Sequence, residues 1–439
     1  MPKVAFHTLG CKVNQVETEQ IMEEFINKGY EIVNFSELAD IYIINTCTVT
    51  HVSDRKSRAM LRRAGRRNPD AIVVAAGCMA QVEAEKLADI DGIDLIIGNS
   101  HKENILPIIE DYYHDRRKGP EVICQEIKAE DRLKPVLYSS QHQRTRAFVK
   151  IQDGCRSFCS YCIVPYARGP VRSKLPEDVF REIEQLLALD YREIVLTGIH
   201  TGLYGNDLSH DINLEKLISL ILKRFTADYR IRLSSIETME VSEGIINLLA
   251  DEDRLCRHLH VPLQSGSNKV LKAMNRRYDR EYYAELIDRA ASKVPGIALT
   301  TDVMVGFPLE EDNDFHKSYE LIKELPVCDL HVFKYSSRPG TPAARIPSIV
   351  SEKEKQQRSQ KLIELAKEKR REFIEGQIGK ELESLVERKQ GSNKYLALSD
   401  NYIEMEFISE QNREGRIIQL IPESINDDTV QGKLSPRKI

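Results

Sequence analysis

Three cysteines fall close together near the middle of the chain, at Cys155, Cys159 and Cys162. Thiolates are soft ligands that suit iron–sulfur clusters and zinc. Three thiolates close in sequence can hold one [4Fe–4S] cluster and leave its fourth iron open, whereas a structural zinc ion usually takes four protein ligands. The C-x3-C-x2-C spacing therefore favours an iron–sulfur cluster, with zinc or metal-free cysteines as the alternatives.

A second set of cysteines follows three separate apolar runs in the N-terminal part of the chain. Cys11 comes after 4–6, Cys47 after 41–44 and Cys78 after 71–75. Continuous apolar strands that alternate with helices are typical of a parallel sheet buried on both faces. The carboxyl ends of such strands share one edge, where open α/β sheets bind ligands. A single cysteine there is more often a packing residue, but three at equivalent positions predict a shared cluster.

The remaining cysteines carry no such pattern. Cys124, Cys256 and Cys328 have no partner at ligand spacing, and we interpret them as packing residues. The total of nine cysteines is odd and stands in a large chain without a secretory signal. Disulfides explain such a set poorly, because reducing compartments keep thiols reduced. Metal binding is therefore the leading interpretation of the other six.

The composition is ordinary for a globular protein of two or three domains. Hydrophobic residues make up 41% and charged residues 30% of the 439 residues, and the formal net charge is −5. A nucleic-acid partner would therefore need a local basic patch. No apolar run reaches the length of a membrane span, and Met1–Phe6 does not resemble a secretory signal. We expect a cytoplasmic protein without membrane contacts.

The fold class predicted from the pattern of apolar runs is α/β. Residues 1–115 alternate strands and helices and predict an N-terminal parallel-sheet domain, and the polar stretch 116–143 is interpreted as a linker. Residues 144–373 repeat a strand–helix unit six times and predict a partial (β/α)6 barrel. The expected barrel strands are 147–151, 193–197, 230–234, 258–261, 298–305 and 329–335. Residues 374–439 predict a small C-terminal β-barrel.

Several motifs together resemble the radical-SAM methylthiotransferases. Thr8–Asn14, Asn45–Thr50 and Gly77-Cys78 are similar to the N-terminal domain of that family, and Gly154–Gly169 is similar to its radical-SAM domain. The C-terminal β segment occupies the place of the family's substrate-binding TRAM domain. The resemblance covers nearly the whole chain. It agrees with the position of Cys155 after the first barrel strand, at the end of a βα barrel where chemistry is usual.

The resemblance implies an enzyme that attaches a CH3–S group to an unactivated carbon. Cys155, Cys159 and Cys162 would hold the [4Fe–4S] cluster whose open iron binds S-adenosyl-L-methionine and generates a radical. Cys11, Cys47 and Cys78 would hold an auxiliary [4Fe–4S] cluster that carries the sulfur to be inserted. One S-adenosyl-L-methionine supplies the methyl group and another the radical, so the cofactors carry the chemistry. No catalytic residue is assigned beyond these cluster ligands.

The branches of the family differ at the first motif. Thr8–Asn14 and Leu196–Gly202 resemble the branch that acts on C2 of N6-threonylcarbamoyladenosine, just 3′ of the anticodon in tRNA. The sister branches, which act on isopentenyladenosine in tRNA or on a ribosomal-protein aspartate, stay open as alternatives. A non-catalytic iron–sulfur protein that binds RNA or senses redox state is a further alternative. The resemblance implies the tRNA anticodon loop and an electron donor as partners; the sequence indicates no oligomeric state.

A basic run follows Cys47 and predicts a helix that contacts RNA phosphates. Its basic residues are Arg55, Lys56, Arg58, Arg62, Arg63, Arg66 and Arg67. A solvated helix face is the alternative, because a charge run alone usually means that. A further basic group is expected to add positive charge around the mouth of the barrel: Arg144, Arg146, Arg168, Arg172 and Lys174.

Three loop positions carry weaker signals. Gly198 and Gly202 follow a predicted strand and would let the backbone approach the methionine end of S-adenosyl-L-methionine, or they are ordinary loop glycines. Leu309 stands where the family usually has a glycine, in the sequence Gly-Phe-Pro-Leu-Glu-Glu. We therefore expect the backbone of that loop to differ from the family's.

Overall fold

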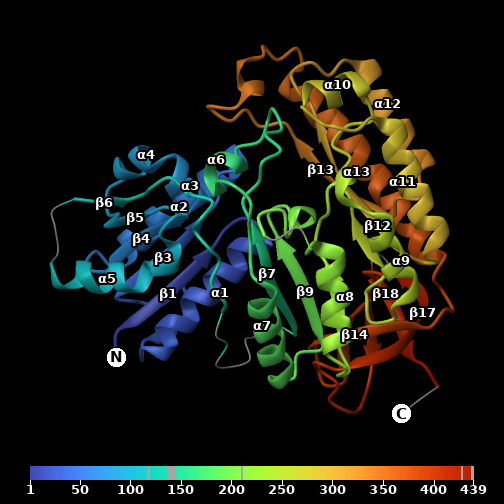
Figure 1. The fold of residues 1–439 in the computed structure, drawn as a ribbon, viewed down its shortest axis with the longest axis horizontal. Helices are drawn as coiled ribbons and strands as arrows, with labels where there is room; N and C mark the ends of the chain where they lie inside the picture. Colours follow the sequence, from blue (N-terminus) through green and yellow to red (C-terminus); the bar gives the residue numbers. More distant parts are fainter. Residues whose placement is uncertain (116–118, 137, 139–144, 209–210, 427–428, 437–439) are drawn as a thin grey trace. The chain divides into compact units, whose positions relative to one another are not determined.

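The computed structural model describes residues 1–115, 119–136, 138, 145–208, 211–426 and 429–436 (Figure 1). The chain forms two compact units. The first unit comprises Met1–Ser139, Gln152–Asp178 and Ser336–Ala344, and the second comprises Ser140–Ile151, Val179–Tyr335 and Arg345–Ile439. Part of the predicted linker, at 116–118, 137 and 139–143, and Arg144 lie outside the described residues. The predicted division at 115, 143 and 373 stays a prediction.

The N-terminal strands form one parallel sheet of six strands, in the order β2-β1-β3-β4-β5-β6 (Figure 1). Their bounds are β1 Lys3–Thr8, β2 Glu31–Val33, β3 Ile41–Thr46, β4 Ile72–Gly77, β5 Leu95–Ile97 and β6 Glu121–Ile123. The predicted parallel sheet is confirmed. The short strand β2 was not predicted, and β6 is a strand within the stretch interpreted as a linker.

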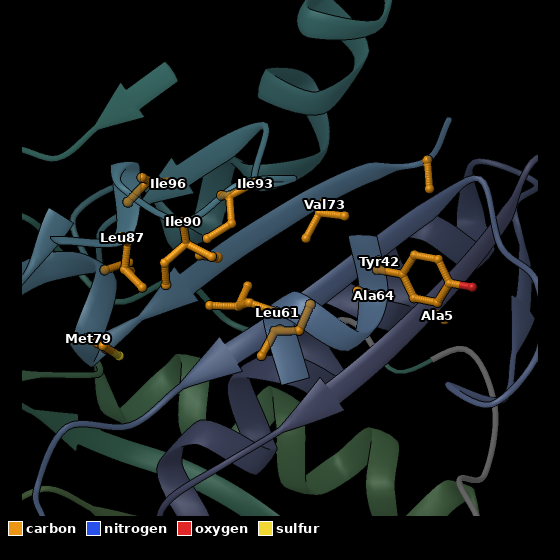
Figure 2. Close-up of a cluster of buried hydrophobic side chains, with 14 of the residues drawn as sticks. Ala5, Tyr42, Leu61, Ala64, Val73, Met79, Leu87, Ile90, Ile93 and Ile96 are labelled. Carbon is orange, nitrogen blue, oxygen red and sulfur yellow. The ribbon is translucent and has the colours of Figure 1, made fainter. Parts of the chain in front are cut away.

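Helices cover both faces of this sheet, so successive strand residues are buried on opposite sides. The helices are α1 Lys12–Asn27, α2 His51–Arg67, α3 Cys78–Val82, α4 Ala84–Ala88 and α5 Ile105–His114. One core joins Tyr42 and Val73 to Leu61 of α2, and Figure 2 shows these side chains converging. The other core joins Ile43 to Phe25 of α1 and to α5. Burial on both faces explains why these strands are continuous apolar runs.

The middle of the chain supplies the strands of the predicted partial barrel, and that architecture is confirmed. One sheet has the order β10-β9-β7-β8 and the other β11-β12-β13. The strands are β7 Arg146–Asp153, β8 Arg172–Ser173, β9 Glu193–Gly198, β10 Arg230–Leu233, β11 His258–His260, β12 Ala298–Val305 and β13 Asp329–Lys334. An isolated parallel bridge pairs Ile231 of β10 with Leu255, which lies just before β11 in the chain.

Helices connect these strands, as the strand–helix repeat requires. The α-helices are α6 Val164–Arg168, α7 Pro176–Ala188, α8 Leu214–Arg224, α9 Glu243–Asp251, α10 Asn268–Ala273, α11 Arg280–Lys293, α12 Asp312–Glu324 and α13 Glu352–Glu375. Short 3-10 turns lie at η1 Lys102–Asn104, η2 Thr201–Leu203, η3 Thr238–Glu240 and η4 Pro342–Arg345. Across the described stretches of the chain, no helix is both long and apolar enough to span a bilayer.

The C-terminal residues form a closed five-stranded barrel, as predicted, in the order β14-β15-β16-β18-β17. Its strands are β14 Leu382–Lys389, β15 Lys394–Ser399, β16 Glu404–Ile408, β17 Ile417–Asn426 and β18 Thr429–Leu434. Buried Glu193 of β9 pairs with Arg230 and Arg232 of β10. Arg232 also donates to the carbonyl oxygens of Ser399 and Asp400, at 2.9 and 2.8 Å. These charge-assisted bonds fix the small barrel to the neighbouring strands.

The loop after β12 needs no glycine at Leu309. Among the described non-glycine residues, five have positive φ, and Leu309 is not one of them. Gly306 has φ +74°, and its backbone N–H donates to Glu310 Oε2 at 2.7 Å. Arg358 of α13 donates to the same carboxylate oxygen at 2.7 Å. The loop is therefore held by Glu310, and a leucine at 309 meets no backbone strain.

Candidate functional site

Each cysteine of the N-terminal set lies just beyond the carboxyl end of a parallel strand. Cys11 is the N-cap of α1, Cys47 follows β3 directly, and Cys78 opens α3 after β4. The pairing register makes β1, β3 and β4 end nearly level. The sheet therefore brings the three cysteines to one edge, as a parallel topology requires.

Two glycines allow these loops to approach one another. Gly10 has φ +102°, and a Cβ there would lie 2.8 Å from the Cβ of Cys47. Gly77 has φ +100°, and a Cβ there would lie 2.5 Å from Asn45 Oδ1. Any side chain at either position would collide with the neighbouring loop and would strain the backbone. Cys47 in turn lies within electrostatic range of Cys11 and Cys78, so the three thiols share one neighbourhood.

Side-chain hydrogen bonds fix the backbone of the cysteine loops. Asn14 Nδ2 donates to the carbonyl oxygens of Leu9 and Thr46, at 2.7 and 3.1 Å. Ser57 Oγ accepts from the N–H of Cys47 at 3.3 Å and donates to its carbonyl oxygen at 3.1 Å. Burial raises the pKa of the Cys47 thiol. The thiolate, which is the metal-binding form, therefore needs a cation or metal beside it.

The central set, Cys155, Cys159 and Cys162, lies on a tight loop after β7. Gly154 has φ +77°, and a Cβ there would lie 1.8 Å from the carbonyl oxygen of Pro170. Phe158 adopts a left-handed φ of +45°, which is unusual for an aromatic residue. The N–H of Cys162 donates to the carbonyl oxygen of Cys159 at 2.9 Å. These features give the loop a tightly turned backbone.

Arg168 joins this loop to the N-terminal helix α1. It is the last residue of α6 and only 1% exposed. Its guanidinium donates to both carboxylate oxygens of Glu17 and to Asn14 Oδ1, and it lies 3.2 Å from Asp153 Oδ2. Lys102 Nζ donates to Glu17 Oε2 at 2.6 Å. Arg168 was expected to add positive charge around the barrel mouth; it adds no exposed charge, because it is buried and paired with acidic residues inside the first unit.

Asn99 makes a second connection between the two cysteine sets. Its Nδ2 donates to the carbonyl oxygen of Ala167 at 2.8 Å and lies 3.6 Å from Cys78 Sγ. Ala167 belongs to α6, which follows Cys162 by a few residues. One side chain thus contacts both an N-terminal cysteine and the helix after the central cysteines. The sequence pattern carried no sign of this role, because an asparagine in a loop has many common uses.

Residues 336–344, from far along the chain, contact both cysteine loops. Arg338 is buried and donates to Thr48 Oγ1 at 3.0 Å and to Asp54 Oδ2 at 2.6 Å. The N–H of Ala343 donates to the carbonyl oxygen of Ser160 at 2.8 Å. Thr48 follows Cys47 directly, and Ser160 lies between Cys159 and Cys162. Sequence reasoning missed this segment, because its only local signal is a turn after the last barrel strand.

The donor sets fit iron–sulfur clusters better than single metal ions. Among the described residues, only His260, Asp302 and His331 bring three His, Cys, Asp or Glu ligand atoms within 4.8 Å of one another. Tetrahedral zinc, with Zn–S bonds of about 2.3 Å, would hold its sulfurs about 3.8 Å apart. A cluster of several irons holds its thiolates further apart. Two sets of three soft donors therefore suit clusters that each leave one iron open.

The other three cysteines belong to neither set. Cys256 and Cys328 are buried in the second unit, and burial raises the pKa of each thiol to about 12. Cys124 Sγ lies 3.2 Å from the carbonyl oxygen of Ala80, and burial raises its pKa as well. Buried thiols of this kind are chemically inert. Their surroundings agree with the interpretation as packing residues.

The basic run after Cys47 forms α2, as predicted, and most of its charge faces solvent. The exposed members are Arg55, Lys56, Arg62, Arg63 and Arg66. Arg58 lies 3.8 Å from Glu83, and Arg67 donates to the carbonyl oxygen of Phe35 at 2.6 Å. Five of the seven predicted residues therefore remain available to a phosphate backbone.

The further basic group contributes less than expected. Lys174 is 1% exposed, and Arg172 is buried 3.4 Å from Asp153. Arg146 forms an ion pair with Glu387 of the small barrel at 2.7 Å. Arg172 and Lys174 therefore do not add exposed positive charge around the barrel mouth, contrary to the expectation. The sequence could not reveal this, because burial of a basic side chain depends on distant partners.

The two glycines proposed for the cofactor lie at the end of β9 and in η2. A Cβ at Gly202 would lie 2.4 Å from the Cβ of Glu240, so packing alone requires a glycine there. Gly198 is the last residue of β9 and is partly exposed. Their role in binding S-adenosyl-L-methionine stays a prediction.

Comparison with known proteins covers both halves of the chain. Residues 3–98 match the family described as "Uncharacterized protein family UPF0004". Residues 149–322 match the "Radical SAM superfamily". The first match contains the N-terminal cysteine set, and the second contains the central set.

Relatives match along nearly the whole length. A Bacillus subtilis protein named threonylcarbamoyladenosine tRNA methylthiotransferase is 42% identical over 426 residues, 96% of this chain and 93% of the relative. An Aquifex aeolicus protein of the same name is 41% identical, over 92% of this chain and 96% of the relative. A Thermoanaerobacter protein named tRNA-2-methylthio-N(6)-dimethylallyladenosine synthase is 32% identical, over 97% of this chain and 91% of the relative.

Solved structures share the fold at low identity. The radical S-adenosylmethionine methyltransferase TsrM from Kitasatospora setae superposes with a TM-score of 0.60 at 16% identity, covering 78% of this chain and 77% of that one. The cobalamin-dependent radical enzyme OxsB gives 0.53 at 11% identity, covering 86% of this chain and 56% of that one. These likenesses support the α/β architecture.

Replacing Arg168 with methionine should lower the free energy of unfolding by about 3–5 kcal/mol, because Glu17 and Asp153 would keep buried carboxylates without their guanidinium. Urea unfolding followed by circular dichroism measures this loss. Arg62→Lys, on the exposed face of α2, is the control and should leave the unfolding transition unchanged. A stability of Arg168→Met within about 1 kcal/mol of the wild type would contradict the structural role of the pair.

Proposed function

We propose that this chain, which belongs to the radical-SAM methylthiotransferases, methylthiolates C2 of N6-threonylcarbamoyladenosine in tRNA, giving 2-methylthio-N6-threonylcarbamoyladenosine 3′ of the anticodon. The enzyme is a radical-SAM methylthiotransferase whose substrate is tRNA. The observation that carries the choice of nucleoside is the identity of 41–42% to relatives named for threonylcarbamoyladenosine, against 32% to the relative named for dimethylallyladenosine.

We assign one [4Fe–4S] cluster to each cysteine set. Cys155, Cys159 and Cys162 would hold the cluster that binds S-adenosyl-L-methionine, and the cysteines at the end of the N-terminal sheet would hold the second. When bound, the first cluster supplies the electron that cleaves S-adenosyl-L-methionine, and the second supplies the sulfur. An electron donor is therefore a required partner. A radical route suits the reaction, because a ring C–H is not ionised by a general base near pH 7.

The chain's own residues position these donors. Arg168 lies within electrostatic range of Cys11 and Cys78 and gives their thiolates a fixed positive neighbour. Arg338 holds the backbone next to Cys47 through Thr48. Because both guanidinium groups are buried, water competes little for their hydrogen bonds, and each cysteine loop keeps one conformation.

The closed barrel of β14–β18 takes the role of a TRAM domain in this proposal and would contact tRNA together with α2.

The dimethylallyladenosine branch and the ribosomal-aspartate branch are the enzymatic rivals. A non-catalytic iron–sulfur protein fits less well, because a sensor has no use for two sets of three thiols that each leave an iron open.

Nucleosides from tRNA of a strain that lacks this gene should lack 2-methylthio-N6-threonylcarbamoyladenosine, and the restored gene should return it. We expect this loss because the proposed reaction is the step that inserts sulfur at C2 of the nucleoside. Mass spectrometry of digested tRNA measures the nucleoside. Unchanged levels of that nucleoside, with loss of the methylthio-isopentenyl one, would mean that the enzyme belongs to the sister branch.

The two cysteine sets should fail in different ways. Cys159→Ala should abolish formation of 5′-deoxyadenosine, because the first cluster loses a ligand. Cys47→Ala should still form 5′-deoxyadenosine but give no methylthio product, because only sulfur delivery is lost. Chromatography of S-adenosyl-L-methionine cleavage products and of nucleosides measures both. Cys328→Ala, far from both loops in sequence and buried, is the matched control. Full product from Cys47→Ala would sink the assignment of the second cluster.

The exposed face of α2 should contribute to tRNA affinity. The triple variant Arg62→Gln, Arg63→Gln and Arg66→Gln should weaken binding and reduce the slope of log affinity against log salt by about 0.7–0.9 for each phosphate that these arginines neutralise. Filter binding at several salt concentrations measures the slope. The control removes three exposed lysines of α13, at Lys353, Lys361 and Lys367. Equal slopes for the two variants would show that α2 is only a solvated face.

A further inference from the structure

The side chain of Asn99 makes two contacts that the proposed function leaves unexplained. Asn99 lies just after β5, and its Nδ2 lies 3.6 Å from Cys78 Sγ, within hydrogen-bond distance for sulfur. The same nitrogen donates to the carbonyl oxygen of Ala167 at 2.8 Å. All three residues belong to the first unit. An amide nitrogen carries two N–H groups, so one is directed at the carbonyl oxygen and the other at the sulfur.

The orientation of this amide follows from its neighbours. If the amide were turned over, Oδ1 would face the carbonyl oxygen of Ala167, and two acceptors would meet. In the observed orientation Oδ1 is buried and accepts no hydrogen bond from the residues that the structure describes. A buried acceptor without a donor destabilises a fold, so the contacts of Nδ2 are what Asn99 contributes at this position.

The charged groups near Cys78 oppose one another. Arg168 and Lys102 lie within electrostatic range of its sulfur. Both cations pair with Glu17, and Arg168 also lies 3.2 Å from Asp153 Oδ2. Two cations thus face two carboxylates, and their combined field at the sulfur is weaker than the field of an unpaired cation. The N–H group of a neutral amide, directed at the sulfur, is not cancelled in this way.

The other two sulfurs of the N-terminal set interact with main-chain donors. The N–H of Asn14 interacts with Cys11, and the N–H of Val49 interacts with Cys47. A side-chain substitution cannot remove a main-chain donor, whereas the donor to Cys78 belongs to a side chain. Asn99 is therefore the position at which the effect of one N–H group on this set can be measured by substitution.

Hydrogen bonds to the sulfurs of an iron–sulfur cluster are among the factors that set its reduction potential. A reduced cluster carries one more negative charge than an oxidised one, so an N–H group at a ligand sulfur stabilises the reduced form more. We propose that Asn99 is a positioning residue that acts through Cys78 and raises the reduction potential of the cluster held by the N-terminal set. This inference rests on the proposed function, because it presupposes that this set holds a cluster.

The test uses a parent chain of full length that carries Cys155→Ala, Cys159→Ala and Cys162→Ala, so that only the N-terminal set can hold a cluster after reconstitution with iron and sulfide. Asn99→Leu keeps the approximate size of the side chain and removes its N–H groups. At a fixed applied potential it should lower the ratio of reduced to oxidised cluster by about tenfold, a shift of about 59 mV for a one-electron couple. Asn99→Asp adds a negative charge and should lower the ratio further. Electron paramagnetic resonance during a redox titration measures the ratio.

Gln81→Met is the matched control. Gln81 Nε2 donates to the carbonyl oxygen of Gln125 at 2.9 Å, and its Oε1 accepts from the N–H of Ser100 at 3.3 Å. Ser100 is the residue after Asn99, so these contacts hold the same loop without a donor to a sulfur of the set. The substitution should therefore leave the reduction potential of the parent chain unchanged.

Three results would overturn the inference. One is an equal potential for Asn99→Leu and the parent chain. Another is an equal shift in Gln81→Met, which would indicate a general loosening of the loop. The third is a lower iron content in both Asn99 variants, which would mean that the amide only holds the loop in place. If the parent chain binds no cluster, the assignment of the second cluster fails together with the inference. A cluster that forms in the parent chain and keeps its potential in Asn99→Leu removes the inference alone.

Discussion

The buried ion pair between Glu17 and Arg168 is the interaction on which the first unit depends. It joins residues 151 positions apart, on α1 and on the helix after the central cysteines. Removing two charges from water is costly, and such a pair holds only when further hydrogen bonds satisfy both groups. Lys102 donates to Glu17, and Asn14 and Asp153 accept from the two terminal nitrogens of Arg168. Because a slightly displaced guanidinium would lose several partners at once, this network specifies one arrangement of the two cysteine segments.

The second constraint on the cysteine loops is that three parallel strands end at nearly the same level along the sheet. Backbone pairing alone sets where β1, β3 and β4 stop, and the glycines at 10 and 77 let the following loops meet without side-chain collisions. Residues 336–344 then contact both cysteine loops through Arg338 and Ala343. Rigid strands, tight glycine turns and buried guanidiniums thus act together. Donor atoms on such elements vary less in position than donor atoms on free loops do.

Much of this arrangement could be predicted from the sequence, because it depends on local patterns. Apolar runs identified the parallel strands, and the cysteines after them identified the sheet edge. The interpretation failed where partners are distant. Arg168 and Lys174 looked like surface charge, yet they are buried, since a basic residue carries no local sign of its acidic partner. The segment at 336–344 and strand β18 were missed for related reasons: one acts through backbone contacts far along the chain, and the other is short and polar.

The two units offer different kinds of donor atom. Both cysteine sets lie in the first unit, and Arg168 lies within electrostatic range of Cys11 and Cys78. The thiols of the second unit, Cys256 and Cys328, are buried and kept protonated by a pKa near 12. That unit instead offers nitrogen and oxygen atoms, in the group of His260, Asp302 and His331. Soft thiolates are the donors that suit iron–sulfur clusters, whereas imidazole nitrogen and carboxylate oxygen are harder ligands.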